Sequence, residues 1–256
     1  MPFSNLILDT SRDVAVLTLN RPDNLNALST DLLNELIRAA EVIGESGTRT
    51  VVVSGSGRAF CAGVDIEMLS DAIEASDKEQ QYATFELGAQ MADAIESIPQ
   101  ITVASLHGFV VGGGIVLAAA CDLRIAAEDT VFSIPEIDLG IPLAWGGIGR
   151  LVREIGPALT KELVMTGRRF TAQEAKAAGF VNEVVAQERV RETAEQLAST
   201  IASKASLPIR ITKAHVAEVL SGDTTRDDAA TAVETLDDPD SVSARDAYLA
   251  QLTARS

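Results

Sequence analysis

Short runs of apolar and polar positions alternate at the start of the chain. The segments "NLILD" and "VAVLTLN" flank a polar turn at residues 11–13, and this pattern predicts a β-hairpin. Over residues 29–43, leucine, isoleucine and alanine recur at helical spacing. That spacing predicts a helix with Ser29 or Thr30 as its N-cap.

A strand, a glycine-containing loop and a helix then follow one another twice. The first copy, residues 50–69, joins "TVVVSG" to "GSGRAFCAGVD". The second, residues 101–121, joins "ITVASL" to three consecutive glycines and a run of small apolar residues. A long polar helix is expected between them, and the chain is mainly helical from about residue 147 onward. Short strands that alternate with helices predict an α/β core.

Length and composition leave room for one large domain, alone or with a smaller appendage. The chain has 256 residues, a mass of 27.0 kDa and 46% hydrophobic residues, enough for a packed core. Its start lacks a basic leader followed by an apolar stretch, and no apolar run reaches the roughly 18–20 residues of a membrane helix. These features favour a soluble cytoplasmic protein.

The net charge bears on which partners the chain can bind, and the cysteines bear on its redox state and on metal binding. A net charge of −16 repels nucleic acid and acidic membranes, so neither is an expected partner. A small anionic ligand can still bind this acidic chain if a few cationic side chains and backbone N–H groups face it. Cys61 and Cys121 lie in apolar surroundings without metal-ligand spacing, so we expect reduced core thiols and no metal site.

Candidate chemistry lies in the glycine loops and in one acidic loop. Each glycine loop alone is equally typical of a tight turn, but two backbone N–H groups from separate loops can converge on one oxygen and stabilise negative charge there. Glu136 is a carboxylate in the apolar loop "FSIPEIDLGIP", where partial burial makes it a candidate general base or acid. A solvated loop glutamate is the alternative. For His107, Asp65 and Asp122 the simplest roles are structural.

Four motifs in order along the chain carry a family resemblance. The segments "LNRPDNLNAL", "GSGRAFCAGVDIEML", "HGFVVGGGIVLAAACDLRIA" and "PEIDLGIP" together resemble the enoyl-CoA hydratase/isomerase family, also called the crotonase family. The resemblance implies an α/β fold built as a spiral of repeated β-β-α units. It also implies an acyl-CoA-binding core over residues 1–195 and a C-terminal helical oligomerisation region over residues 196–256. A homotrimer or a dimer of trimers is then expected.

The resemblance also implies roles for the glycine loops. The backbone N–H groups of Val64 and Gly113 match the family's oxyanion hole for the thioester oxygen, and Gly112 stands beside it as a substrate-binding position. The adenine of coenzyme A would lie near Ala62, and Arg58 matches a basic phosphate contact. Coenzyme A is part of the substrate here, so no separate cofactor is expected.

Departures from the family pattern bear on the reaction. Hydratases of the family hold water with two glutamates; Glu136 matches one, and Val116 stands in place of the other. A single glutamate suits the isomerases that convert 3-enoyl-CoA to 2-enoyl-CoA. An apolar pocket formed by Val116, Ile141, Leu143 and Trp145 would exclude water, although Trp145 is equally typical of a packing residue.

Three alternatives stay open beside the isomerase. The first is an enoyl-CoA hydratase with low activity that uses Glu136 and a second polar group. The second is a non-catalytic acyl-CoA-binding homologue that keeps the oxyanion loops without turnover. The third applies the same enolate chemistry to another acyl-CoA, with decarboxylation or ring chemistry.

Overall fold

A six-stranded sheet forms the centre of the computed structural model, which describes residues 3–223 and 225–255. The strand order is β1-β2-β3-β4-β6-β9; β1 is antiparallel to β2, and the remaining pairs are parallel. Its strands are β1 (Leu6–Asp9), β2 (Val14–Leu19), β3 (Thr50–Gly55), β4 (Ile101–Leu106), β6 (Leu123–Ala127) and β9 (Glu183–Val185). A second sheet joins β5 (Phe109–Val111), β7 (Val131–Ser133) and β8 (Phe170–Thr171).

Helices cover the central sheet and extend beyond it. The α-helices are α1 (Thr30–Glu45), α2 (Ile66–Glu74), α3 (Lys78–Glu96), α4 (Gly113–Ala120), α5 (Gly147–Thr166), α6 (Ala172–Ala177), α7 (Val190–Ala202), α8 (Ser206–Ser221), α9 (Asp228–Glu234) and α10 (Pro239–Arg255). Short 3-10 helices span Pro22–Asn24, Pro135–Leu139 (η2) and Gln187–Arg189. The Ser29 side chain accepts a hydrogen bond from the Leu32 N–H, so the predicted cap of α1 is confirmed.

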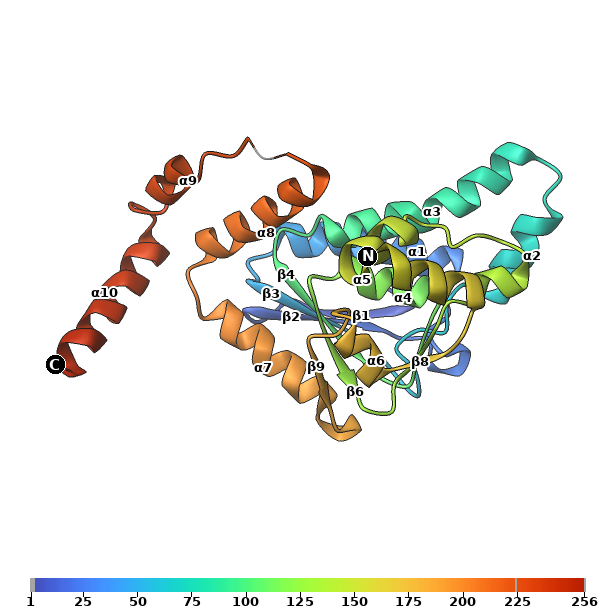
Figure 1. The fold of residues 1–256 in the computed structure, drawn as a ribbon, viewed down its shortest axis with the longest axis horizontal. Helices are drawn as coiled ribbons and strands as arrows, with labels where there is room; N and C mark the ends of the chain where they lie inside the picture. The colour runs from blue at the N-terminus through green and yellow to red at the C-terminus, as the bar shows by residue number, and fades with distance from the viewer. Residues whose placement is uncertain (1–2, 224, 256) are drawn as a thin grey trace.

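Both faces of the central sheet are buried, which explains the continuous apolar run of β3. Val51 and Val53 belong to the main core with residues of α1, α3 and α4, whereas Val52 faces the other way and packs with α7. Figure 1 shows this arrangement, with α7 on one side of the sheet and α1, α3, α4 and α5 on the other. Strands buried on both faces are typical of parallel sheets. The predicted hairpin and the two strand–loop–helix passages are confirmed.

The C-terminal helices are attached to this core through a few polar contacts. The Lys213 ammonium of α8 donates to the Asp122 carboxylate at 2.7 Å and to two backbone carbonyls. Beyond α8, helices α9 and α10 project away from the body of the molecule, in red at the left of Figure 1. The expected boundary between residues 195 and 196 falls inside α7, which packs along the sheet. The oligomerisation role of the region stays a prediction.

The two cysteines are buried, and none of the described helices suits a membrane. Burial raises the pKa of the Cys61 and Cys121 thiols to about 12, so both stay protonated at neutral pH. Among the described residues, none of the helices combines the length and the apolar character needed to cross a membrane.

Candidate active site

The two glycine loops lie against each other through backbone hydrogen bonds. The Cys61 N–H donates to the Phe109 carbonyl at 3.1 Å, and the Val111 N–H donates to the Cys61 carbonyl at 3.0 Å. This pairing brings the end of the first loop, at Val64, to the start of α4, at Gly113. Within residues 3–223 and 225–255, neither the Val64 N–H nor the Gly113 N–H donates to an acceptor. Two unpaired donors at the wall of one cavity are the arrangement expected of an oxyanion hole.

Each glycine of the triplet makes room for a different neighbour. A Cβ at Gly112 would overlap Oε1 of Glu136, and a Cβ at Gly113 would overlap the indole of Trp145. At Gly114 a Cβ would lie 2.6 Å from the Cys61 carbonyl oxygen of the first loop. Gly112 also has a φ of +48°, a value that side-chain-bearing residues rarely adopt. The triplet therefore lets α4 begin in contact with three surrounding groups.

Glu136 lies in η2, directly beside the start of α4. Burial raises the pKa of its carboxyl above the ordinary glutamate value, and a hydrogen bond with its own backbone opposes that rise in part. Its Oε2 is buried and has no hydrogen-bond partner among the described residues. A desolvated carboxylate with an unpaired oxygen that faces a cavity is suited to taking and returning a proton.

A small apolar cavity of about 30 Å³ joins these groups. It is lined by Val64, Leu69, Phe85, Gly113, Val116, Glu136, Ile141, Pro142, Leu143, Ala144 and Trp145. Of the described residues that line it, Glu136 alone is ionisable. The cavity therefore offers a single proton-transferring side chain.

Seven of the ten predicted site residues line this cavity, and three do not. Gly112 stands behind the lining, against Glu136, while Arg58 is exposed and Ala62 is half-buried on the first loop. Sequence reasoning did not single out the other four lining residues: Pro142 and Ala144 lie in the same loop as three predicted residues, whereas Leu69 and Phe85 lie on separate helices. The latter two come from α2 and α3, and nothing in the spacing of those helices marks a face turned toward a pocket rather than toward the core.

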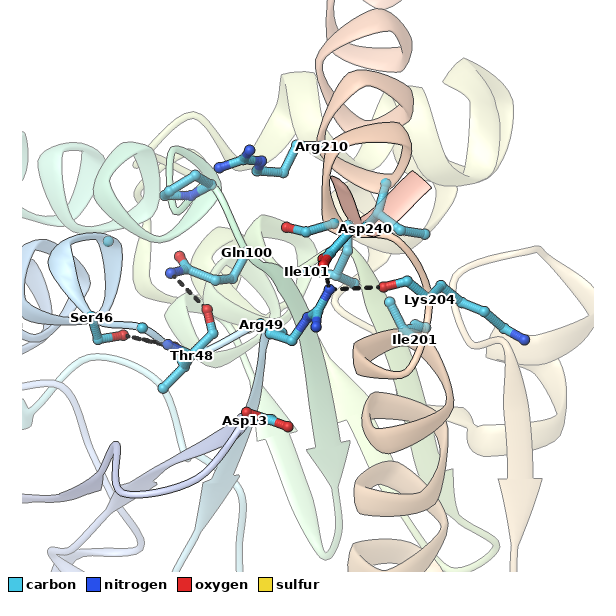
Figure 2. A pocket seen from close by; sticks show the side chains of 15 residues that line it. Asp13, Ser46, Thr48, Arg49, Gln100, Ile101, Ile201, Lys204, Arg210 and Asp240 are labelled. Atoms are coloured by element: carbon cyan, nitrogen blue, oxygen red, sulfur yellow. Dashed lines mark hydrogen bonds and ion pairs between the residues drawn. The ribbon is translucent and has the colours of Figure 1, made fainter. Parts of the chain in front are cut away.

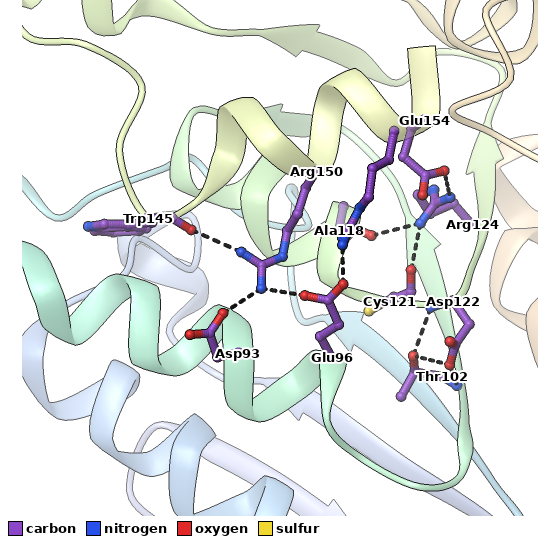
Figure 3. Close-up of polar contacts among 11 residues, drawn as sticks. Asp93, Glu96, Thr102, Ala118, Cys121, Asp122, Arg124, Trp145, Arg150 and Glu154 are labelled. Atoms are coloured by element: carbon purple, nitrogen blue, oxygen red, sulfur yellow. Dashed lines mark hydrogen bonds and ion pairs between the residues drawn. The ribbon is translucent and has the colours of Figure 1, made fainter. Parts of the chain in front are cut away.

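Trp145 closes one side of the cavity, and a buried arginine supports its backbone. Figure 3 shows Arg150, at the start of α5, donating to the Trp145 carbonyl at 3.2 Å. The same guanidinium donates to Asp93 at 2.7 Å and to Glu96, both on α3. Arg150 therefore ties the pocket-lining segment that precedes α5 to the surface of α3.

The other polar residues near the loops have structural partners, as their sequence positions predicted. Asp65 accepts from the Glu67 N–H as the N-cap of α2, and its carboxylate pairs with Arg21 at 2.7 Å. Asp122 accepts from the N–H and hydroxyl of Thr102, and Figure 3 shows this contact. Nε2 of His107 lies 3.2 Å from a loop carbonyl oxygen.

A larger cavity of about 420 Å³ lies elsewhere, between the beginning of the central strands and the C-terminal helices (Figure 2). Its polar side chains contact one another: Arg49 pairs with Asp240 and donates to the Lys204 carbonyl at 3.1 Å. It contains none of the predicted site residues. The smaller apolar cavity is therefore the candidate active site.

Comparison with known proteins gives consistent matches over most of the chain. A family model described as enoyl-CoA hydratase/isomerase matches residues 9–250. The crotonyl-CoA hydratase of Syntrophomonas wolfei is 36% identical over 228 residues, which cover 88% of this chain and 86% of that protein. The short-chain-enoyl-CoA hydratase of Clostridium acetobutylicum is 34% identical over 215 residues, with 83% and 81% covered. An enoyl-CoA hydratase structure from Mycobacterium smegmatis superposes with a TM-score of 0.87 at 30% identity, covering 97% of each chain.

Proposed function

The chain belongs to the enoyl-CoA hydratase/isomerase family, and on that premise we propose that it moves the double bond of a 3-enoyl-CoA to the 2-position with Glu136 as the only proton carrier. The observation that carries this proposal is the single ionisable side chain of the cavity, with Val116 among the apolar residues that face it. Because the isomerisation returns the proton that it removes, one mobile base is sufficient for the whole reaction.

The proposed steps use the contacts described above. The thioester oxygen accepts hydrogen bonds from the Val64 and Gly113 N–H groups. The Glu136 carboxylate removes a proton from C2, and the electron pair of that C–H bond moves into a dienolate whose negative charge lies on the thioester oxygen. The positive end of the α4 dipole and the two N–H donors stabilise that charge. Protonated Glu136 then delivers the same proton to C4, which leaves the double bond between C2 and C3.

Apolar side chains around the carboxylate support transfer within the pocket. Val116, Ile141 and Leu143 line the cavity beside Glu136, and their side chains carry no polar atom that could hold a water in position for addition to the double bond. A pocket closed to water also protects the dienolate from protonation by solvent. On the exposed side, Arg58 is the proposed contact for the phosphates of coenzyme A.

Hydration is the second candidate, because both relatives named above carry hydratase names. For this chain to act as a hydratase, a polar group other than residue 116 must hold the attacking water together with Glu136. Such an enzyme would convert a 2-enoyl-CoA to a 3-hydroxyacyl-CoA. The two candidates therefore differ in whether water enters the product.

The deciding experiment follows trans-3-hexenoyl-CoA as the conjugated 2-enoyl thioester appears, for the wild type and Glu136→Gln. The proposal expects turnover that falls by about 10³-fold in the variant, within the range for loss of a general acid–base group. Asp138→Asn is the matched control: it lies two residues away in η2, is exposed and does not line the cavity, so its activity should match the wild type. Addition of water to 2-hexenoyl-CoA without isomerisation would instead establish the hydratase.

A further inference from the structure

We propose that Trp145 sets the size of the acyl group that the pocket accepts, an inference that rests on the proposed acyl-CoA function. Trp145 is the only tryptophan of the chain, and 8% of it is exposed. It has the largest side chain among the residues that line the cavity. The space beside the proposed oxyanion hole therefore depends on this one residue more than on any other lining residue.

The indole lies between two glycines from different helices. On one side is Gly88 of α3, where a Cβ would overlap Cε2, Cδ2 and Nε1 of the indole. On the other is Gly113 at the start of α4, where a Cβ would overlap Cζ3. The ring therefore bridges α3 and the glycine that supplies a proposed oxyanion N–H. Any acyl chain that extends past the thioester on this side meets the ring.

The backbone of Trp145 is fixed, whereas its indole packs between two glycines. Residue 145 has a φ of +58°, its carbonyl accepts from the buried Arg150, and the neighbouring Ala144 carbonyl accepts from the Gly147 N–H at 2.9 Å. Among the described residues, the side-chain hydrogen bond recorded at Trp145 is the one that its backbone carbonyl accepts from Arg150. Because the main chain does not move with the side chain, a smaller residue at 145 would enlarge the pocket rather than let the loop collapse.

The small volume of the apolar cavity limits the acyl group that can enter it. A cavity of about 30 Å³ is comparable with the share of liquid volume of roughly one water molecule. An acyl group of any length must therefore displace lining side chains, a longer one more of them, and the indole next to Gly113 is the largest of these side chains. A methyl group at Gly88 would act in the opposite direction, since it would push the ring from α3 toward Gly113. The inference thus predicts opposite effects for two variants at the same contact.

The experiment measures binding of butyryl-CoA and octanoyl-CoA by isothermal titration calorimetry. Both are saturated thioesters, so binding is measured without isomerisation. The wild type should bind butyryl-CoA about tenfold or more tightly than octanoyl-CoA, within the range that added methylene groups produce in a shaped pocket. Trp145→Leu should remove that preference by strengthening octanoyl-CoA binding. Gly88→Ala should weaken binding of both thioesters and shift the tryptophan emission of the free protein.

Phe180→Leu is the control for general loosening of the core. Phe180 is fully buried and does not line the candidate active site. Its variant should keep the wild-type ratio of the two dissociation constants. An unchanged ratio in Trp145→Leu, or the same change in Phe180→Leu, would overturn the inference.

Turnover separates this inference from the proposed reaction. If the binding ratios change as expected but no variant isomerises a 3-enoyl-CoA, Trp145 limits the acyl group and the isomerase assignment fails. If turnover is present and the ratios do not respond to Trp145→Leu, the reaction stands and the size inference fails. Absence of binding by every form of the protein would defeat both.

Discussion

The main chain of Gly112 lies in contact with the carboxylate of Glu136, so the backbone at this residue determines where the base is placed. Gly112→Ala adds a methyl group that overlaps Oε1 at a φ of +48°. We expect kcat to fall by about 100-fold, the effect of a displacement of roughly 1 Å in a reacting group. The backbone conformation of Gly112, with φ +48° and ψ −115°, is one that residues with a side chain rarely adopt, and alanine there should cost about 1–3 kcal/mol of unfolding free energy. Steady-state kinetics and urea unfolding measure the two effects.

A variant at a second glycine distinguishes displacement of the Glu136 carboxylate from backbone strain. Gly222, at the end of α8, has a φ of +86°, and no neighbouring atom lies within 4 Å of the position that an added methyl group would take. Gly222→Ala should therefore lose stability through its left-handed backbone, with φ +86° and ψ +5°, and keep full activity. A loss of activity in Gly222→Ala equal to that in Gly112→Ala would show that backbone strain, not displacement of Glu136, is responsible.

Burial of Glu136 also links activity to stability. In the unfolded chain its pKa is the ordinary value of about 4.3, whereas burial raises the pKa in the folded protein. Stability from this group is therefore fully present below the ordinary value and is lost as the pH rises through the raised pKa. We expect Glu136→Gln to be more stable than the wild type at neutral pH. Urea unfolding at neutral pH and below the ordinary glutamate pKa measures the difference, which should vanish at the lower pH.

At the scale of elements, the apolar and polar pattern within a segment predicted the strands and helices that depend on that segment alone. The hairpin, α1 and the two strand–loop–helix passages follow from alternation, helical spacing and capping within each segment. The contact between Gly88 and Trp145 could not be predicted in this way, because it joins α3 to a loop far along the chain. Phe85 was missed for the same reason. Glu136 was identifiable because one charged residue stood out in an apolar loop.

Buried arginines are a second feature that the sequence did not reveal. Arg124 and Arg150 are almost fully buried and fix α5 against the rest of the fold. Figure 3 shows Arg124 contacting two backbone carbonyls around α4 and the Glu154 carboxylate, while Arg150 reaches α3. Arginine is usually exposed, so a pattern of apolar and polar positions assigns both residues to the surface.

Arg150 therefore offers a test at the level of helix packing. Arg150→Met keeps an unbranched side chain but removes the hydrogen bonds that join α5 and the Trp145 carbonyl to α3. The carboxylates of Asp93 and Glu96 are partly exposed and stay solvated, so we expect a loss of about 1–3 kcal/mol in unfolding free energy.

Arg153→Met is the matched control for this measurement. Arg153 pairs with the same Glu96 but is 33% exposed, and exposed ion pairs contribute about 1 kcal/mol or less. Its unfolding free energy should stay close to that of the wild type. Equal losses in the two variants, measured by chemical denaturation under the same conditions, would contradict a special role for the buried arginine.

At the scale of the whole molecule, the C-terminal helices expose more apolar surface than their packing explains. Large apolar side chains are exposed on α8, α9 and α10: Val216, Val219, Leu220, Val233, Tyr248, Leu249 and Leu252. Figure 1 shows α9 and α10 projecting from the body of the molecule, although α10 contacts α8 and its Asp240 pairs with Arg49. Extended apolar surface on a projecting element is typical of an interface between subunits.

The family resemblance predicts a trimer or a dimer of trimers, and this apolar surface is the expected interface between its subunits. Light scattering coupled to size exclusion should give a native mass three or six times 27.0 kDa. The double variant Leu249→Glu, Leu252→Glu places charges on the apolar positions of α10 and should lower that mass, because burying unpaired carboxylates in an interface is unfavourable. Gln251→Glu adds a charge at an exposed polar position of the same helix and should leave the mass unchanged. A wild type with the mass of one chain would show that these helices serve another purpose.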